Sequence, residues 1–228
     1  MRIIYYLQFY GSKTVIFFLE LVIKIFVKND VFFDKANFEW TKILEENYEA
    51  IKQEYININN KNRLIDATVF SKEQIKSVAP DQWSVFPLFV YGNKIEKNWV
   101  ECPVTVNCLK QIPTITTAWF SVMKPGTYVK PHRGTYKGYL RCLMGLIVPD
   151  DITQSGLTIN NTTYHWKKNE CVIFDDTFIH SAYNNSEITR VVLYIDFIRP
   201  MPFFLMYISK VLTDMFGKSL YVKNMKLN

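Results

Sequence analysis

Residues 117–148, TAWFSVMKPGTYVKPHRGTYKGYLRCLMGLIV, carry the clearest signal of the fold class. They contain three short runs of apolar and β-branched residues, at 117–123, 127–132 and 139–148, separated by turns rich in Pro and Gly. Runs of this length with such turns predict β-strands. Similar runs follow the same pattern at 83–91, 157–166, 171–175 and 190–198. The sequence therefore predicts a β-sandwich or barrel over the C-terminal two-thirds of the chain.

The composition describes a folded protein with a modest basic excess. The chain has 228 residues, of which 49% are hydrophobic and 21% charged, so it can bury a core and is not a disordered chain. Lys and Arg number 27 against 21 Asp and Glu, a net charge of +6. This excess suits an anionic substrate or a membrane surface, but it is too small to indicate a nucleic-acid partner.

The four cysteines stand at positions 102, 108, 142 and 171, and no CxxC pair occurs. This spacing argues against a structural zinc site, and a disulfide framework has no support in a chain of this length. We expect buried free thiols.

The N-terminal residues 2–27 are strongly apolar but contain charges. On a helix, Lys13, Glu20, Lys24 and Lys28 would form one polar stripe, in which Glu20 and Lys24 are an i,i+4 pair. The stripe favours an amphipathic helix, lying on a membrane or packed on the domain, over a clean membrane span, although an uncleaved signal anchor stays open. Residues 201–212 are a second apolar helix candidate. Two locations remain open, membrane-associated and cytoplasmic.

These patterns divide the chain into four parts. Residues 1–28 form the apolar or amphipathic N-terminal segment, and residues 29–80 a helical region that includes a helix expected at 38–55. Residues 81–200 form the β domain, and residues 201–228 a helical tail.

The strand expected at 190–198 places an arginine among apolar residues. Val191, Leu193, Ile195 and Phe197 share one face, and Arg190 lies on the other with Val192, Tyr194 and Asp196. A buried guanidinium needs an anion, which can be a bound ligand or a carboxylate of the protein itself. Arg141 stands in the same way beside Leu143 in the run 139–148. Two arginines near His132 and His180 would suit a metal that chelates a dicarboxylate.

Two stretches resemble the aspartyl/asparaginyl β-hydroxylase family: Phe120–Pro149, and Trp166–Pro200 with its core Val-Ile-Phe-Asp-Asp-Thr-Phe-Ile-His. Within them, Pro-His-Arg-x-x-Tyr-x-Gly-x-Leu-Arg at 131–141 and Asp-Phe-Ile-Arg-Pro-Met at 196–201 most resemble the lipid A 2-hydroxylase branch. The resemblance covers roughly residues 83–201, and its motifs recur in order at compatible spacing.

This resemblance implies a mainly β fold with flanking helices, the double-stranded β-helix or cupin-like jelly roll. It implies a dioxygenase that uses Fe(II), 2-oxoglutarate and O2 to hydroxylate a C–H bond, with release of succinate and CO2. His132 and His180 would bind the iron. Arg190 with Ser121 would hold the distal carboxylate of 2-oxoglutarate, and Arg141 its metal-proximal carboxylate. His132, His180 and Arg190 are thus the expected catalytic residues.

The sequence departs from the family pattern at two positions. Gly134 stands where the iron-binding carboxylate of many such oxygenases is found, two residues after the first His. The peptide-hydroxylating branch also has Gly there, as do iron halogenases, whereas the lipid A branch has Asp. Leu143 stands where the family has a His that contacts the proximal carboxylate.

Some residues near these motifs have simpler interpretations. Asp175 and Asp176 are the nearest carboxylates that could replace the missing ligand, but a turn role fits them better. His165 is best interpreted as a structural histidine.

Two substrate classes follow from these observations. The apolar termini and the basic charge favour a lipid acyl chain, whereas Gly134 favours an Asp or Asn side chain of a protein. The alternative is a catalytically inactive binding module on the same fold, marked by Gly134 and Leu143.

Overall fold

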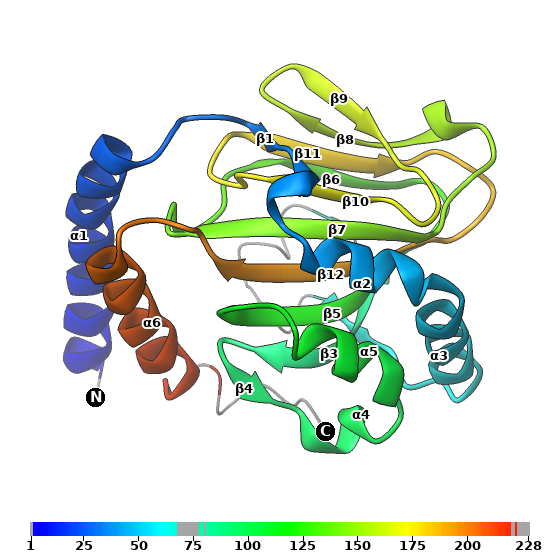
Figure 1. Ribbon diagram of the computed structural model, residues 1–228, viewed down its shortest axis with the longest axis horizontal. Helices are drawn as coiled ribbons and strands as arrows, with labels where there is room; N and C mark the ends of the chain where they lie inside the picture. Colours follow the sequence, from blue (N-terminus) through cyan, green and yellow to red (C-terminus); the bar gives the residue numbers. More distant parts are fainter. Residues whose placement is uncertain (1, 68–77, 80, 220–221, 223–228) are drawn as a thin grey trace.

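The computed structural model describes residues 2–67, 78–79, 81–219 and 222, and it contains two antiparallel sheets packed face to face (Figure 1). Leu157 and Ile159 of the smaller sheet belong to the same buried cluster as Val192 and Tyr194 of the larger sheet. Helices cover the outer face and one end of this sandwich. The predicted double-stranded β-helix with flanking helices is confirmed.

The larger sheet has eight strands: β1 (Phe32–Phe33), β2 (Ile65–Asp66), β3 (Trp83–Val90), β4 (Asn93–Lys94), β5 (Ile115–Met123), β7 (Tyr139–Ile147), β10 (Cys171–Phe174) and β12 (Arg190–Ile198). Their order is β1-β10-β7-β12-β5-β3-β2, with β4 paired to β3. The strands β1 and β2 lie in the region 29–80, which the sequence analysis expected to be helical. Part of this region therefore belongs to the sheet and not to a helix. Residues 68–77 and 80 of this region lie outside the described residues.

The smaller sheet has four strands: β6 (Thr127–His132), β8 (Ser155–Ile159), β9 (Thr162–His165) and β11 (His180–Asn184). Their order is β6-β11-β8-β9. The chain passes from the larger sheet to this one through the Lys-Pro-Gly turn at 124–126, where Gly126 has a φ of 73° that favours glycine.

The alternation predicted for β12 is found in the packing. Val191, Leu193 and Ile195 pack in the outer core, between the larger sheet and the helices. Val192 and Tyr194 point instead into the core between the two sheets. The same alternation in β7 directs Leu143 into the inner core and its neighbours Cys142 and Met144 outward. A polar side chain on an inner face is therefore held inside the barrel, where a site can form.

The outer face of the larger sheet is covered by α2 (Trp40–Glu46), α3 (Tyr48–Asn60), α4 (Glu96–Trp99) and α5 (Pro103–Leu109) (Figure 1). The single helix expected at 38–55 is divided at Asn47, which has φ −98° and ψ 12°. The Asn47 side chain donates to the Ile43 carbonyl at 2.8 Å, so it competes with the helical backbone. All four cysteines are free and buried, as predicted.

Two further helices, α1 (Arg2–Phe26) and α6 (Phe203–Gly217), pack beside each other at one end of the barrel (Figure 1). Ile23 of α1 and Leu205 of α6 share a buried cluster with Tyr136. The Tyr136 hydroxyl lies 2.7 Å from Ser209 Oγ and ties α6 to the loop before β7. No helix in the described part of the chain has the length and apolar character needed to cross a membrane. Of the expected tail 201–228, residues 220–221 and 223–228 lie outside the described residues.

Candidate active site

His132 and His180 lie side by side at one end of the smaller sheet. His132 ends β6 and His180 begins β11, and the two residues are opposite each other in the register of these adjacent strands. The centroids of their rings are 4.2 Å apart. Antiparallel pairing thus brings together two imidazoles that are 48 residues apart in sequence (180 − 132).

Each of these rings is oriented by its own backbone. His132 Nδ1 lies 2.9 Å from the Lys130 carbonyl oxygen, and His180 Nδ1 lies 2.9 Å from the Phe178 carbonyl oxygen. A carbonyl only accepts, so each Nδ1 carries the proton and Nε2 keeps a lone pair for a metal. Burial, with His132 and Arg141 nearby, lowers the pKa of His180 to about 3, and burial also lowers the pKa of His132. Both rings are therefore neutral near pH 7, the form that binds metals.

The volume that a side chain at Gly134 would occupy is filled by the carboxylate of Asp176. A Cβ at position 134 would overlap the Asp176 carboxyl atoms, and the Gly134 N–H donates to the Asp176 carbonyl at 2.7 Å. Asp176 is buried, and its burial raises the pKa of its carboxyl even though Arg141 is close. The Asp176 carboxylate thus takes the space that a side chain at position 134 would need, although Asp176 comes from the connection between β10 and β11. Within the described residues, no three His, Cys, Asp or Glu side chains form a metal-binding group.

We expect Gly134→Asp to destabilise the protein by about 1–3 kcal/mol, because the new side chain overlaps the Asp176 carboxylate. Adding Asp176→Gly should recover at least half of this loss, because one carboxylate then occupies the shared volume. Urea unfolding of both single variants and the double variant measures the coupling. Additive losses in the double variant would contradict this prediction.

Arg141 is already paired by carboxylates of the protein. Its guanidinium lies 2.8 Å from Asp176 Oδ2 and donates to Asp196 from Nε at 2.8 Å and from Nη2 at 3.1 Å. It also stacks on the Tyr194 ring, 4.4 Å from the centroid. Although burial acts in the opposite direction, Asp176 and Asp196 hold the pKa of Arg141 well above its usual value. To bind a ligand carboxylate, Arg141 would have to share or exchange one of these partners.

Arg190 has the opposite environment. Its side chain is buried, yet no carboxylate of the described residues pairs with it, and its Nε has no hydrogen-bond partner there. Its contacts are the Met123 sulfur and the ring of Trp166, whose centroid lies 5.0 Å away. The indole Nε1 of Trp166 also lacks a partner among the described residues. Burial without an anion lowers the pKa of Arg190 to about 9. Two unused donors beside a buried cation are the environment expected of an anion-binding site.

Ser121 lies on β5 beside β12, opposite Val192. It is buried, and its hydroxyl accepts from Trp83 Nε1 at 2.9 Å. Trp119 and Met123, at the same alternation on β5, pack in inner clusters, so Ser121 shares the face from which Arg190 projects. The hydroxyl proton remains available to an acceptor.

The remaining candidate residues, His165 and Leu143, lie on other strands than the histidine pair. His165 is on β9, two strands from β11 in the smaller sheet. Leu143 is buried in the inner core and provides no polar group there. Asp196, Tyr194 and Trp166 belong to the site region but were not singled out from the sequence as site residues. The signal for Asp196 was its position on the Arg190 face of β12.

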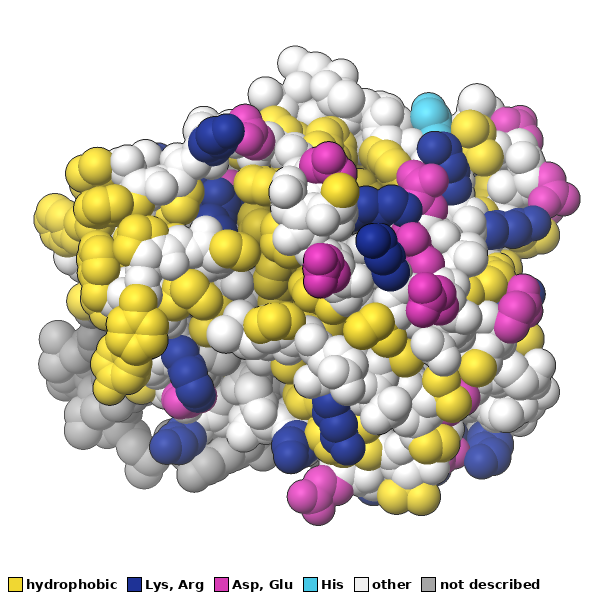
Figure 2. Space-filling view, viewed as in Figure 1, with side chains coloured by type: hydrophobic (Ala, Val, Ile, Leu, Met, Phe, Trp, Pro, Cys, Tyr) yellow, Lys and Arg dark blue, Asp and Glu magenta, His cyan; other side chains and the backbone are white. Residues whose placement is uncertain are grey.

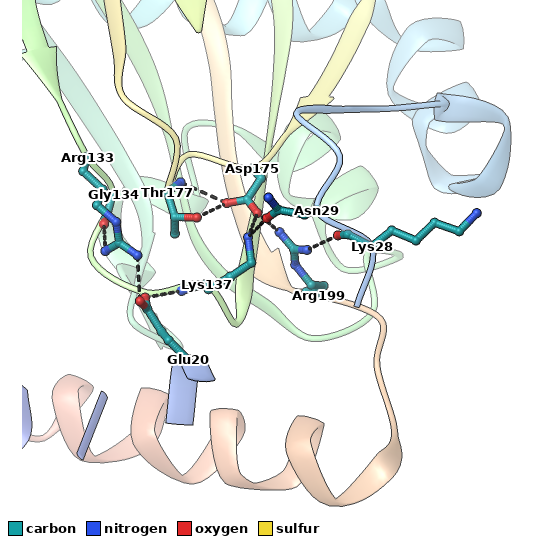
Figure 3. Close-up of polar contacts among 9 residues, drawn as sticks. All are labelled: Glu20, Lys28, Asn29, Arg133, Gly134, Lys137, Asp175, Thr177 and Arg199. Carbon is teal, nitrogen blue, oxygen red and sulfur yellow. Dashed lines mark hydrogen bonds and ion pairs between the residues drawn. The ribbon is translucent and has the colours of Figure 1, made fainter. Parts of the chain in front are cut away.

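A second buried polar cluster is centred on Asp175, whose carboxylate precedes His180 by five residues (Figure 3). Lys137 Nζ pairs with Asp175 at 2.7 Å, and Arg199 pairs with the same carboxylate. The Asp175 side chain also accepts from the Thr177 backbone N–H at 2.9 Å. The two cations outweigh the effect of burial and lower the pKa of Asp175. Asp175 therefore fixes the turn before His180, and each of its two carboxylate oxygens already accepts two contacts from described residues.

Helix α1 reaches this region through Glu20, which is buried against the barrel (Figure 3). Its carboxylate pairs with Arg133 Nη2 at 2.6 Å and accepts from the Lys137 backbone N–H at 2.9 Å. Glu20 thus points toward the connection between β6 and β7 and pairs with the residue after His132, whereas the sequence placed it on a polar stripe with Lys24.

Comparison with known proteins identifies a family and individual similar proteins. A family model described as aspartyl/asparaginyl β-hydroxylase matches residues 45–200. The ornithine lipid ester-linked acyl 2-hydroxylase of Rhizobium tropici is 35% identical over 174 residues, which cover 76% of this chain and 62% of that protein. The human aspartyl/asparaginyl β-hydroxylase is 28% identical over 71% of this chain and 21% of that protein. A Pseudomonas putida prolyl-4-hydroxylase structure aligns with a TM-score of 0.43 and 10% identity, covering 67% of this chain and 88% of that one.

Proposed function

Because the chain belongs to the aspartyl/asparaginyl β-hydroxylase family, we propose that it is an Fe(II)- and 2-oxoglutarate-dependent dioxygenase. It hydroxylates an unactivated C–H bond and releases succinate and CO2. The observation that carries the proposal is the pair of neutral imidazoles at 132 and 180, each with its Nδ1 bound to a carbonyl and its Nε2 free for a metal. Bound Fe(II), with 2-oxoglutarate and O2, would supply the oxidising power.

Different residues of the chain would bind the metal and the two carboxylates of 2-oxoglutarate. His132 and His180 hold the metal through Nε2, and their backbone hydrogen bonds keep the two rings oriented. Arg190 and Ser121 receive the distal carboxylate of 2-oxoglutarate, which gives the buried guanidinium the anion that it lacks. Arg141 holds Asp176 and Asp196 and would contact the proximal carboxylate by sharing one of these partners. The apolar walls between the sheets exclude water from the reacting groups.

For the substrate, we propose first an acyl chain of a membrane lipid. This choice rests on the similarity to the Rhizobium tropici ornithine lipid acyl hydroxylase, which is higher than the similarity to the human enzyme. An Asp or Asn side chain of a protein is the second candidate, because Gly134 matches the peptide-hydroxylating branch. The chain spans only 62% and 21% of the lengths of these two relatives, so the activity of each whole protein is carried over as part of this proposal.

The test is iron-dependent succinate formation by the purified full chain. The protein receives Fe(II), 2-oxoglutarate and O2 together with ornithine lipids, other acylated lipids, or Asp- and Asn-containing peptides. We expect succinate together with a substrate that gains the mass of one oxygen atom. The control is the double variant His132→Ala/His180→Ala. Equal succinate from wild type and this variant across the whole panel would favour the inactive binding module.

A further inference from the structure

Helices α1 and α6 expose most of the large hydrophobic side chains on the surface of this protein. Of the eighteen such exposed side chains among the described residues, thirteen lie on these two helices. Figure 2 shows them gathered over α1 and α6 at the left edge of the molecule. We call this surface the apolar platform; it consists of Val15, Phe17, Phe18, Leu21, Val22, Ile25, Phe26, Phe203, Phe204, Tyr207, Ile208, Val211 and Met215.

The platform is one continuous surface built from two helices. The rings of Phe26 on α1 and Phe204 on α6 are in edge-to-face contact, with centroids 5.6 Å apart. Beneath them, Ile23 and Leu205 pack in the same buried cluster. A monomer in water rarely exposes an apolar area formed by this many large side chains, so the platform indicates a binding surface.

Helix α1 carries apolar side chains both on the face packed against the barrel and on the face turned away from it. Ile16, Leu19 and Ile23 face the barrel, while Phe18, Val22 and Ile25 face outward. The only acidic side chain of the helix, Glu20, is turned inward to Arg133. A helix whose outward face is apolar as well as its packed face needs an apolar environment on the outer side too.

The charges around the platform select the occupant. Between Thr14 and Asp30, the exposed charged side chains are Lys24, Lys28 and Asp30, and none of them has an ion pair in the described structure. On α6, the one acidic side chain, Asp214, is paired with Lys210 at 3.0 Å, and Lys218 follows the helix. An apolar surface bordered by unpaired lysines is complementary to a bilayer with anionic headgroups, on which each lysine contributes about 1 kcal/mol.

We propose that the apolar platform docks the protein on an anionic lipid bilayer. The platform lies at the end of the barrel that carries the histidine pair, because Glu20 of α1 contacts Arg133, the residue after His132. Docking would therefore bring the site close to the bilayer. The further step, that the substrate is an acyl chain of this bilayer, rests on the proposed function. The docking proposal is independent of it.

The test measures flotation of the full chain with vesicles of phosphatidylcholine, with or without phosphatidylglycerol. Ile25→Ser/Phe203→Ser removes two platform side chains that are 78% and 82% exposed, so the fold should be unaffected. Val100→Ser is the matched control, because Val100 is also 82% exposed but lies on a different surface. We expect the platform variant to lose at least about tenfold in vesicle partitioning and the control to match wild type.

Charge is tested separately by Lys24→Gln/Lys28→Gln, which should lower binding to phosphatidylglycerol vesicles by about tenfold and leave binding to phosphatidylcholine unchanged. Equal flotation of the platform variant and wild type would overturn the proposal. The proposal would also be overturned if wild type did not float and formed a dimer, and the platform variant were a monomer. The surface would then be an interface between two copies of the chain.

The same samples separate this proposal from the enzymatic one. The variant His132→Ala/His180→Ala should float like wild type although it forms no iron-dependent succinate. The platform variant should keep any succinate that wild type forms without lipid. If wild type floats with vesicles but forms no succinate, the proposed function is contradicted and the docking proposal is supported. If wild type forms succinate but does not float, the docking proposal is contradicted and the proposed function is supported.

Discussion

Replacing Arg190 with methionine is expected to raise the half-saturating concentration of 2-oxoglutarate by at least about a hundredfold, which corresponds to about 2.7 kcal/mol. The reason is that Arg190 is the buried cation to which no carboxylate of the described chain is paired. Without the guanidinium, the distal carboxylate of the cosubstrate would enter an apolar space lined by Trp166 and Met123. Succinate formation measured against 2-oxoglutarate concentration gives this value.

The same substitution should stabilise the protein when 2-oxoglutarate is absent, by about 1–3 kcal/mol in urea unfolding, because it removes an unpaired buried charge. Arg141→Met is the contrasting variant. It leaves Asp176 and Asp196 without their cation and should destabilise by about 3–5 kcal/mol. The interpretation of Arg190 as a ligand site fails if Arg190→Met unfolds more easily and binds 2-oxoglutarate normally.

Replacing His180 with alanine is expected to raise the Fe(II) concentration for half-maximal succinate formation by at least about a hundredfold. Loss of an outer-shell partner of a metal ligand costs about 10–100-fold in affinity, and loss of the ligand itself should cost no less. His180 is almost fully buried and its Nδ1 is committed to the Phe178 carbonyl, so alanine removes a pre-oriented Nε2 that water replaces poorly.

His165→Ala is the matched control for this prediction, because it removes the histidine that lies on β9, away from the pair. The iron dependence of this variant should stay within about threefold of wild type, well below the loss expected for a ligand. Similar iron dependence of the two variants would show that His180 has no special part in metal binding.

Local sequence patterns were sufficient to predict the strands that surround the site and the faces of their side chains. The alternation along β12 placed Arg190 and Tyr194 on one face and Leu193 on the other, and the two cores confirm this division. Period-two alternation is a property of the strand alone, so it can be predicted without knowing the partner strand. The burial of the four cysteines was also predicted from local information, namely their residue type and spacing.

The relations between distant segments could not be predicted in this way. The register that sets His132 opposite His180 depends on the pairing of two strands far apart in the chain, and only the resemblance of the motifs suggested it. That Asp176 fills the volume beside Gly134 depends on how two connections cross in space. Glu20 was interpreted from its neighbour Lys24, whereas its partners lie more than a hundred residues away.

The inward position of Glu20 also has a consequence for the order of events during synthesis. Its partners are separated from it by 113 and 117 residues, so the ribosome completes α1 well before Arg133 and Lys137 emerge. Until then the nascent helix carries apolar side chains on both faces and an unpaired carboxylate. We therefore expect the newborn chain to engage a chaperone or a bilayer early, and the helix to be seated on the barrel only after β7 has been translated.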